Sequence, residues 1–196
     1  MLLVQKLSRT RMALKRCITS LFVHRCAIED NTYWYAAIQM SGYVNLTVNN
    51  SDITGRNYGI IVSSAWIGSR VSVKNTVIRG RRYGVQCYGS STVLDCHVEN
   101  SQLQSITCQH VRSCTVQRCI MNSSTSSYQA INAYYVQTLV IDRNIIANNT
   151  PGEIVRVSYC NDVQASFVHF YCRKTDSNIV TFLTRISFFL YQPDNS

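Results

Sequence analysis

The stretch Ile53-Thr54-Gly55-Arg56-Asn57-Tyr58-Gly59-Ile60 returns 25 residues later as Ile78-Arg79-Gly80-Arg81-Arg82-Tyr83-Gly84-Val85. Five of the eight positions are identical in the two copies. A unit of this length that recurs with its apolar residues in place is typical of a protein built by stacking copies of one structural element.

The same unit extends along most of the chain. An apolar residue recurs at intervals of 20 to 25 residues, at Val23, Val48, Val73, Val93, Val116, Ile141 and Ala165. Five positions after each of them stands a second apolar residue, in the series Ile28, Ile53, Ile78, Val98, Met121, Ile146 and Phe170. Between the two lies a residue that is small or an amide in most copies, in the series Cys26, Ser51, Thr76, Cys96, Cys119, Asn144 and Val168.

Within a repeat, apolar and polar side chains alternate, as in Leu46-Thr47-Val48 and Val71-Ser72-Val73. This alternation is the pattern of a β-strand, and Asn50-Ser51 is typical of a tight corner. So short a unit cannot bury its own apolar face, so its copies must stack, with paired strands about 4.8 Å apart. The sequence therefore predicts an all-β, single-stranded parallel β-helix of about seven turns. A β-sandwich would not show recurring columns.

A family resemblance rests on the same repeat. The segment Ile141-Asp142-Arg143-Asn144-Ile145-Ile146-Ala147-Asn148-Asn149 resembles the repeat of the parallel β-helices of the pectate-lyase-like superfamily. That resemblance covers residues 21–182 and implies a right-handed β-helix. It does not select a function, because the superfamily holds polysaccharide lyases, hydrolases, epimerases, phage tailspikes and non-enzymatic scaffolds.

The two ends depart from the repeat, and we expect the β-helix to span residues 21–182. Residues 1–20 are rich in basic residues, and we predict a cap or partial turn there, because an open end exposes strand edges. An arm for nucleic acid or membrane is the alternative. Residues 183–196 are predicted to form a C-terminal cap or tail. The apolar residues from Phe182 onward would equally suit contact with another chain, so a homo-oligomer is compatible with the sequence.

The composition limits the classes of protein to which the chain can belong. The chain has 196 residues, the length of one domain or one piece of a larger one, and a net charge of +9. No apolar run approaches the ~18 residues of a membrane span, so we expect no membrane-spanning segment. The run from Met1 to Val4 is too short for the core of a signal peptide. The charge could attract nucleic acid, but arginines beside asparagine corners also solvate a β-helix, which disfavours that partner.

Nine cysteines are scattered along the chain. Their odd number and spacing argue against a disulfide framework and against a zinc site. We expect buried free thiols and folding in a reducing, cytoplasmic-type compartment, and no metal.

A first candidate site is a column of tyrosines. Tyr33, Tyr58 and Tyr83 lie 25 residues apart, so they should stack on neighbouring turns. The accompanying arginines are Arg56, Arg81 and Arg82. Sugar rings pack on aromatic faces and arginine binds carboxylates, so this ribbon suits an acidic glycan. The alternatives are a stack that only supports the corner and a protein interface.

A second candidate site follows the first apolar column. If the alternation holds, one outward patch joins Asp95, Arg118, Asp142 and Arg143 across three turns. The resemblance implies that such residues would be catalytic in a lyase, where Ca²⁺ or arginine neutralises the uronate, or in a hydrolase, where carboxylates act as acid and base. The alternative is a ladder of salt bridges without catalysis.

Together these features predict a β-helix domain that binds polysaccharide, as tailspike or depolymerase domains do, and that cleaves it only if the second site is catalytic. Few carboxylates are present, which favours binding over catalysis. The alternative from another class is a non-enzymatic intracellular scaffold for protein–protein interaction.

Overall fold

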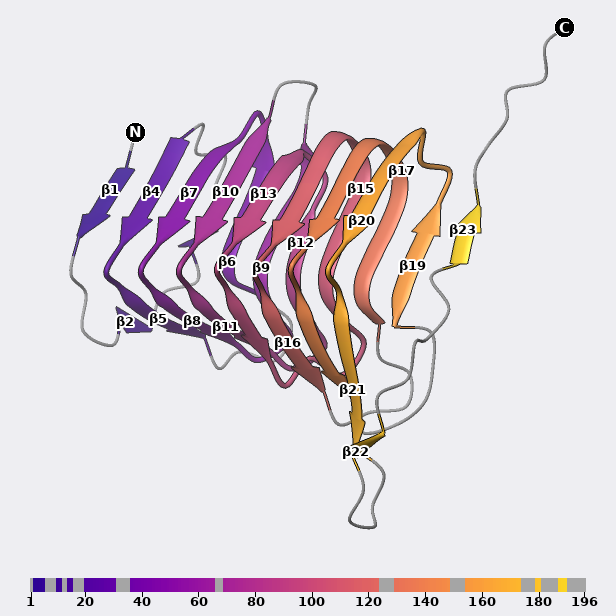
Figure 1. Ribbon diagram of the computed structural model, residues 1–196. Coiled ribbons are helices and arrows are strands. Elements are labelled where there is room, and N and C mark those ends of the chain that lie inside the picture. Colours follow the sequence, from indigo (N-terminus) through magenta and orange to yellow (C-terminus); the bar gives the residue numbers. More distant parts are fainter. Residues whose placement is uncertain are drawn as a thin grey trace, which may run out of the picture.

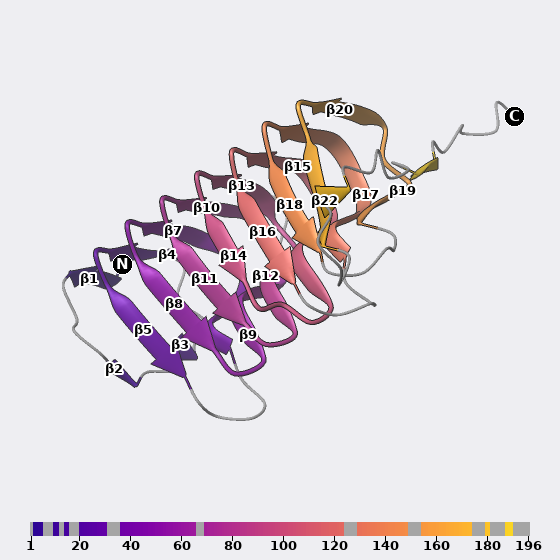
Figure 2. The same cartoon turned by 60° about the horizontal axis from the view of Figure 1, so that its bottom comes forward.

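A computed structural model describes residues 2–5, 10–11, 14–15, 20–30, 36–65, 69–123, 129–148, 154–173, 179–180 and 187–189. Its strands wind into a rod with three walls (Figures 1 and 2). Every pairing between strands is parallel except that of β21 with β22.

The first wall stacks the strands that carry the first apolar column. They are β1 (Leu2–Gln5), β4 (Ser20–His24), β7 (Asn45–Asn49), β10 (Arg70–Lys74), β13 (Ser90–Leu94), the second halves of β15 (Gln104–Gln117) and β17 (Gln129–Asp142), and β20 (Asp162–Ser166). The register is constant, since Leu21 pairs with Leu46 and Leu46 with Val71.

The second wall stacks the strands that follow the corner. They are β2 (Thr10–Arg11), β5 (Ala27–Asp30), β8 (Asp52–Gly55), β11 (Val77–Gly80), β14 (His97–Glu99), β16 (Ile120–Ser123), β18 (Ile145–Asn148), β21 (His169–Arg173) and β22 (Ile179–Val180). The third wall holds β3 (Leu14–Lys15), β6 (Ala36–Gly42), β9 (Tyr58–Ala65), β12 (Tyr83–Cys87), the first halves of β15 and β17, β19 (Val155–Ser158) and β23 (Ser187–Phe189). The predicted fold class, an all-β parallel solenoid, is confirmed.

The core is made of the columns that the repeat predicted. Val48, Val73, Val93 and Val116 are fully buried, and so is Ile53 in the second column. Each of these side chains therefore packs on its copies in the neighbouring turns, and the first column ends at Ala165, which is exposed. At the N-terminal end, β1, β2 and β3 pair with β4, β5 and β6.

The corner between the first and second walls is built the same way in every turn. Its outer residue has a positive φ of 46° to 53° at Arg25, Asn50, Asn75, Asp95, Arg118, Arg143 and Phe167. Except after Phe167, where Val168 follows, the next residue is buried and its side chain bonds to main-chain groups. Asn144, for example, accepts a hydrogen bond from the Cys119 N–H and donates one to the Val116 carbonyl, both at 2.9 Å.

The corner between the second and third walls needs glycine for a different reason. A Cβ on Gly55 or Gly80 would collide with the carbonyl oxygen of Tyr58 or Tyr83, respectively. These glycines therefore let the chain turn tightly just before the two tyrosines of the candidate ribbon.

The cysteines correct one expectation. Cys108 and Cys114 form a disulfide, whereas the sequence was taken to predict only free thiols. Both cysteines lie in β15, which turns sharply at His110, where φ is 53°. This bend points both side chains into the same core, with their Cα atoms 6.5 Å apart. The expectation of free thiols is therefore wrong at these two positions.

The other cysteines with described side chains follow the prediction. The free thiols of Cys26, Cys87, Cys96, Cys119 and Cys160 are all buried. Within the described ranges, no helix has the length and apolar character that crossing a bilayer requires.

Candidate binding surface on the third wall

Tyr58 and Tyr83 begin β9 and β12 and are direct partners in the register. Their ring centroids are 4.8 Å apart and their planes differ by 7°. That separation equals the spacing of neighbouring strands, about 4.8 Å, so the two rings follow the register of the turns. Both side chains are half-buried, so part of each tyrosine stays open to solvent.

The Tyr58 phenol stays protonated over the physiological range. Burial and the neighbouring Tyr83 raise the pKa of Tyr58 above its ordinary value of 10, and the positive charge of Arg82 opposes this rise. The Tyr58 hydroxyl is therefore available as a hydrogen-bond donor as well as an acceptor.

The tyrosine column is flanked by other residue types. Ala36 of β6 pairs with Tyr58, and Gln104 and Gln129 continue the column beyond Tyr83. Tyr33, the third member of the predicted column, lies outside the described residues.

Three arginines surround this corner. Arg56, Arg81 and Arg82 are all exposed on the turns that precede Tyr58 and Tyr83. Their main chains join neighbouring turns, since the Arg82 N–H bonds to the Asn57 carbonyl at 3.0 Å. Within the part of the chain that the structure describes, neither Arg81 nor Arg82 makes an ion pair. The corner thus presents positive charge beside tyrosine rings.

Amide side chains cover the wall next to the tyrosines. Gln104 donates to the Gln129 side chain at 3.0 Å and accepts from the Thr107 hydroxyl at 2.6 Å. Gln104, Gln129 and Asn132 are all partly exposed. A polar, uncharged surface therefore extends from Tyr83 toward the C-terminal turns.

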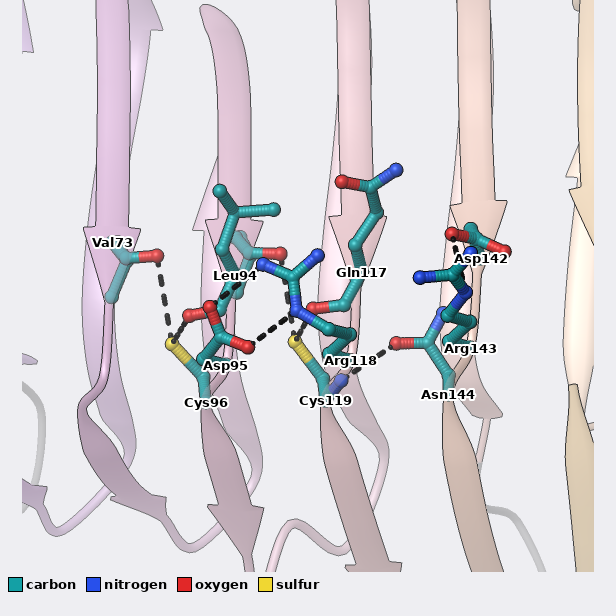
Figure 3. A network of polar contacts seen from close by, with 11 residues as sticks. Val73, Leu94, Asp95, Cys96, Gln117, Arg118, Cys119, Asp142, Arg143 and Asn144 are labelled. Carbon is teal, nitrogen blue, oxygen red and sulfur yellow. Dashed lines mark hydrogen bonds and ion pairs between the residues drawn. The ribbon is translucent and has the colours of Figure 1, made fainter. Parts of the chain in front are cut away.

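The second candidate site lies at the opposite corner, between the first and second walls. Figure 3 shows Asp95 and Arg118 side by side on neighbouring turns. The Arg118 Nε and Nη2 donate to the two Asp95 carboxylate oxygens at 2.6 and 2.8 Å. Hydrogen bonding to Arg118 lowers the pKa of Asp95 below its ordinary value. Asp95 is therefore an ionised carboxylate with both oxygens engaged.

Asp142 and Arg143 lie one turn further on (Figure 3). The Ser166 hydroxyl donates to Asp142 at 2.7 Å, and the Arg143 Nε lies 3.6 Å from Asp142. All four residues of this patch thus come together on three turns, and each contacts another member or a neighbouring turn. A general base needs a free carboxylate oxygen near the substrate, and this arrangement engages both oxygens of Asp95. No group of three or more metal-ligating side chains occurs within the described residues.

Sequence analysis missed a second aromatic column on the third wall. His110, Tyr135 and Tyr159 stack at the corner that leads back to the first wall, with centroids 5.0 and 4.8 Å apart. Tyr134 packs edge-on against all three rings. The signal was present, because the three residues are spaced by 25 and 24 positions, which matches the repeat.

Comparison with known proteins gives a fold family. The family model described as "right handed beta helix region" matches residues 6–119, which is more than half of the chain. No curated protein and no solved structure matched.

Proposed function

The chain belongs to the right-handed β-helix family, and from that premise we propose that it binds a polysaccharide bearing acidic groups. The ligand contacts the corner made by Tyr58, Tyr83 and the exposed Arg81 and Arg82. The function is of the kind that tailspike and depolymerase domains perform when they hold a glycan. The ligand is bound without being cleaved.

One observation carries this proposal: a stacked, partly exposed tyrosine pair stands beside guanidinium groups that have no carboxylate partner in the described residues. Partly open ring faces pack against the C–H faces of sugar rings. Free guanidinium groups bind carboxylate or sulfate in a forked geometry. Phenol and amide groups supply hydrogen bonds to sugar hydroxyls.

Binding is favoured over cleavage by the state of the second candidate site. Asp95 is tied to Arg118 through both oxygens, and Asp142 accepts from Ser166. These contacts describe a ladder of ion pairs along a corner rather than an acid and a base facing a substrate. We therefore assign Asp95, Arg118, Asp142 and Arg143 to the stability of the corner.

The proposal is tested with a panel of acidic and neutral glycans, by binding affinity and by release of reducing ends. The wild type should bind acidic glycans more tightly than neutral ones, and added salt should weaken the acidic ones. Arg81→Ala with Arg82→Ala should abolish that preference. Arg70→Ala is the matched control, because Arg70 is an exposed arginine on the first wall. Equal loss in the control, or no glycan binding by the wild type, would overturn the proposal.

A protein-binding scaffold is the second candidate function, and a separate surface favours it. Ile120 and Ile145 are exposed register partners on the second wall, and Phe167 is 70% exposed at the adjoining corner. Exposed apolar side chains at neighbouring positions are typical of protein interfaces. If this surface holds a partner or a second copy, Ile120→Asp should abolish that association and leave glycan binding unchanged. Light scattering on the purified protein would show a homo-oligomer directly.

A further inference from the structure

We propose that the second aromatic column, His110 with Tyr135 and Tyr159, is the far end of one extended glycan-binding surface. The inference rests on the proposed function and adds to it the length of the ligand: a linear polymer that crosses the third wall, rather than a short sugar held at one corner. Four observations support it.

The first observation is ring exposure. Tyr135 and Tyr159 are 44% and 42% exposed, although each packs against another ring. Their centroids are 4.8 Å apart with planes at 19°, so the two rings form a stacked pair that solvent still reaches. Tyr134, which packs edge-on against the column, holds it in place.

The second observation is backbone conformation. His110, Tyr135 and Tyr159 have φ values of 53°, 53° and 54°. Bulky residues are rare in this left-handed region, where asparagine or glycine would turn the corner at lower cost. Asn50 and Asn75 do so at the corner between the first and second walls. Two tyrosines at such positions favour a use for the rings, although arginine and phenylalanine also adopt this φ at the first corner.

The third observation is a polar row beside the rings. Two positions after each ring stands an exposed polar residue, in the series Arg112, Gln137 and Asn161. The residues between, Val111, Val136 and Cys160, are buried and anchor the corner. Rings and hydrogen-bonding groups therefore repeat together along the rod. Rings that can pack on sugar faces and side chains that can bond sugar hydroxyls therefore occur together at this corner.

The fourth observation is the path between the two columns. Gln129 follows Tyr83 and Gln104 in the same column, two turns further along the rod. It is the first residue of β17, whose part in the third wall ends at Tyr134 and Tyr135. The partly exposed Gln129 and Asn132 line this path. Six residues along the strand and two turns along the rod separate the two columns, which makes a distance of about 20 Å. A glycan that contacts both columns must therefore be an oligosaccharide of several units.

The test compares short and long oligosaccharides of the same acidic glycan on wild type and on Tyr135→Asn with Tyr159→Asn. Asparagine tolerates the left-handed φ at both positions, so the double variant should fold with an unchanged melting temperature. Affinity for long chains should fall at least tenfold, because the second contact raises affinity through effective concentration. Affinity for short chains should be unchanged. Tyr43→Asn is the control, because Tyr43 is an exposed tyrosine at an earlier turn.

Each result decides between the two levels of the proposal. If long and short chains bind wild type equally, or if the double variant binds long chains normally, the extended surface is wrong while the Tyr58 corner stands. If the double variant changes only the oligomeric state, the column is a protein interface and the inference is overturned. If wild type binds no glycan of any length, the proposed function itself fails.

Discussion

The outer residue of the first corner shows how much one backbone angle constrains a side chain. All seven residues there have a φ near 50°, yet the sequence supplies asparagine, aspartate, arginine and phenylalanine. Asparagine and aspartate tolerate this region because they bond locally to the main chain. Arginine and phenylalanine adopt it only because the stacked corners on either side fix the backbone.

Arg143→Asn should therefore stabilise the protein. Its φ is 51°, its side chain is largely exposed, and its contact with Asp142 is long, so little is lost with the guanidinium. Relief of the left-handed strain should raise the free energy of unfolding by about 1 kcal/mol. Chemical denaturation measures this change. Arg70→Asn, in a strand, should give no such gain, and a loss of stability in Arg143→Asn would contradict the explanation.

Asp95→Asn removes the charge of Asp95 but keeps a residue type that tolerates the left-handed φ. The variant therefore tests the ion pair without changing the backbone preference. The lowered pKa of Asp95 means that its ion pair stabilises the fold above the ordinary carboxyl pKa of about 3.9. That contribution disappears as the pH falls through the lowered pKa and the carboxylate takes up a proton. Because both partners are substantially exposed, the difference at pH 7 should not exceed about 1 kcal/mol.

Denaturation of the wild type and Asp95→Asn between pH 7 and pH 2 measures this difference. The gap between the two proteins should narrow steadily as the pH falls. Reducing-end release should be equally absent from both. A gap that widens toward acid would mean that Asp95 is destabilised rather than stabilised by its surroundings.

At the scale of the corner and the strand, the buried amide of Asn144 joins two neighbouring turns of the rod. Asn144→Ala leaves the Cys119 N–H and the Val116 carbonyl without partners in the core. Each unsatisfied buried group costs about 1–3 kcal/mol, so the free energy of unfolding should fall by about 2–6 kcal/mol. Thermal melting tests this. Asn122→Ala, which loses an exposed hydrogen bond of 3.4 Å, should change stability far less.

The bend of β15 at His110 gives a test of the thiols. Mass spectrometry of the native protein should find one bond between Cys108 and Cys114. The buried free thiols should react slowly with an alkylating reagent. Burial raises the pKa of Cys87 to about 12, so at pH 8 almost none of it is the reactive thiolate. Rapid labelling of Cys87 in the folded protein, or the absence of that bond, would show that the core is arranged differently.

The repeat allowed much of this to be predicted from sequence, because a fixed period places residues on neighbouring turns. The repeat alone places Tyr58 beside Tyr83 and Asp95 beside Arg118 on neighbouring turns. The period does not predict where a strand bends. The disulfide depends on the left-handed His110, a residue that carries no turn signal of its own. The second aromatic column was harder to predict because His110 and Tyr135 lie inside long strands, where only the repeat spacing marks them.

At the scale of the whole rod, stability comes from columns that run through every turn. Val73→Asp places a carboxylate at a fully buried position between Val48 and Val93. A buried, unpaired charge costs several kcal/mol, which is comparable to the entire stability of a domain. Circular dichroism of wild type should show β structure, and the variant should lose it. A variant with the wild-type melting temperature would show that this column does not face the core.

The constant register bears on how a gene for such a protein can change in length. Because Leu21, Leu46 and Val71 occupy one column, removing residues 45–69 would set β4 directly against β10 with leucine still facing valine. Each turn meets only its two neighbours, so a copying error that drops or doubles a whole turn leaves every surviving interface intact. A gene of this kind can change the length of the protein in steps of one turn. The number of turns that carry a tyrosine on the third wall changes with it.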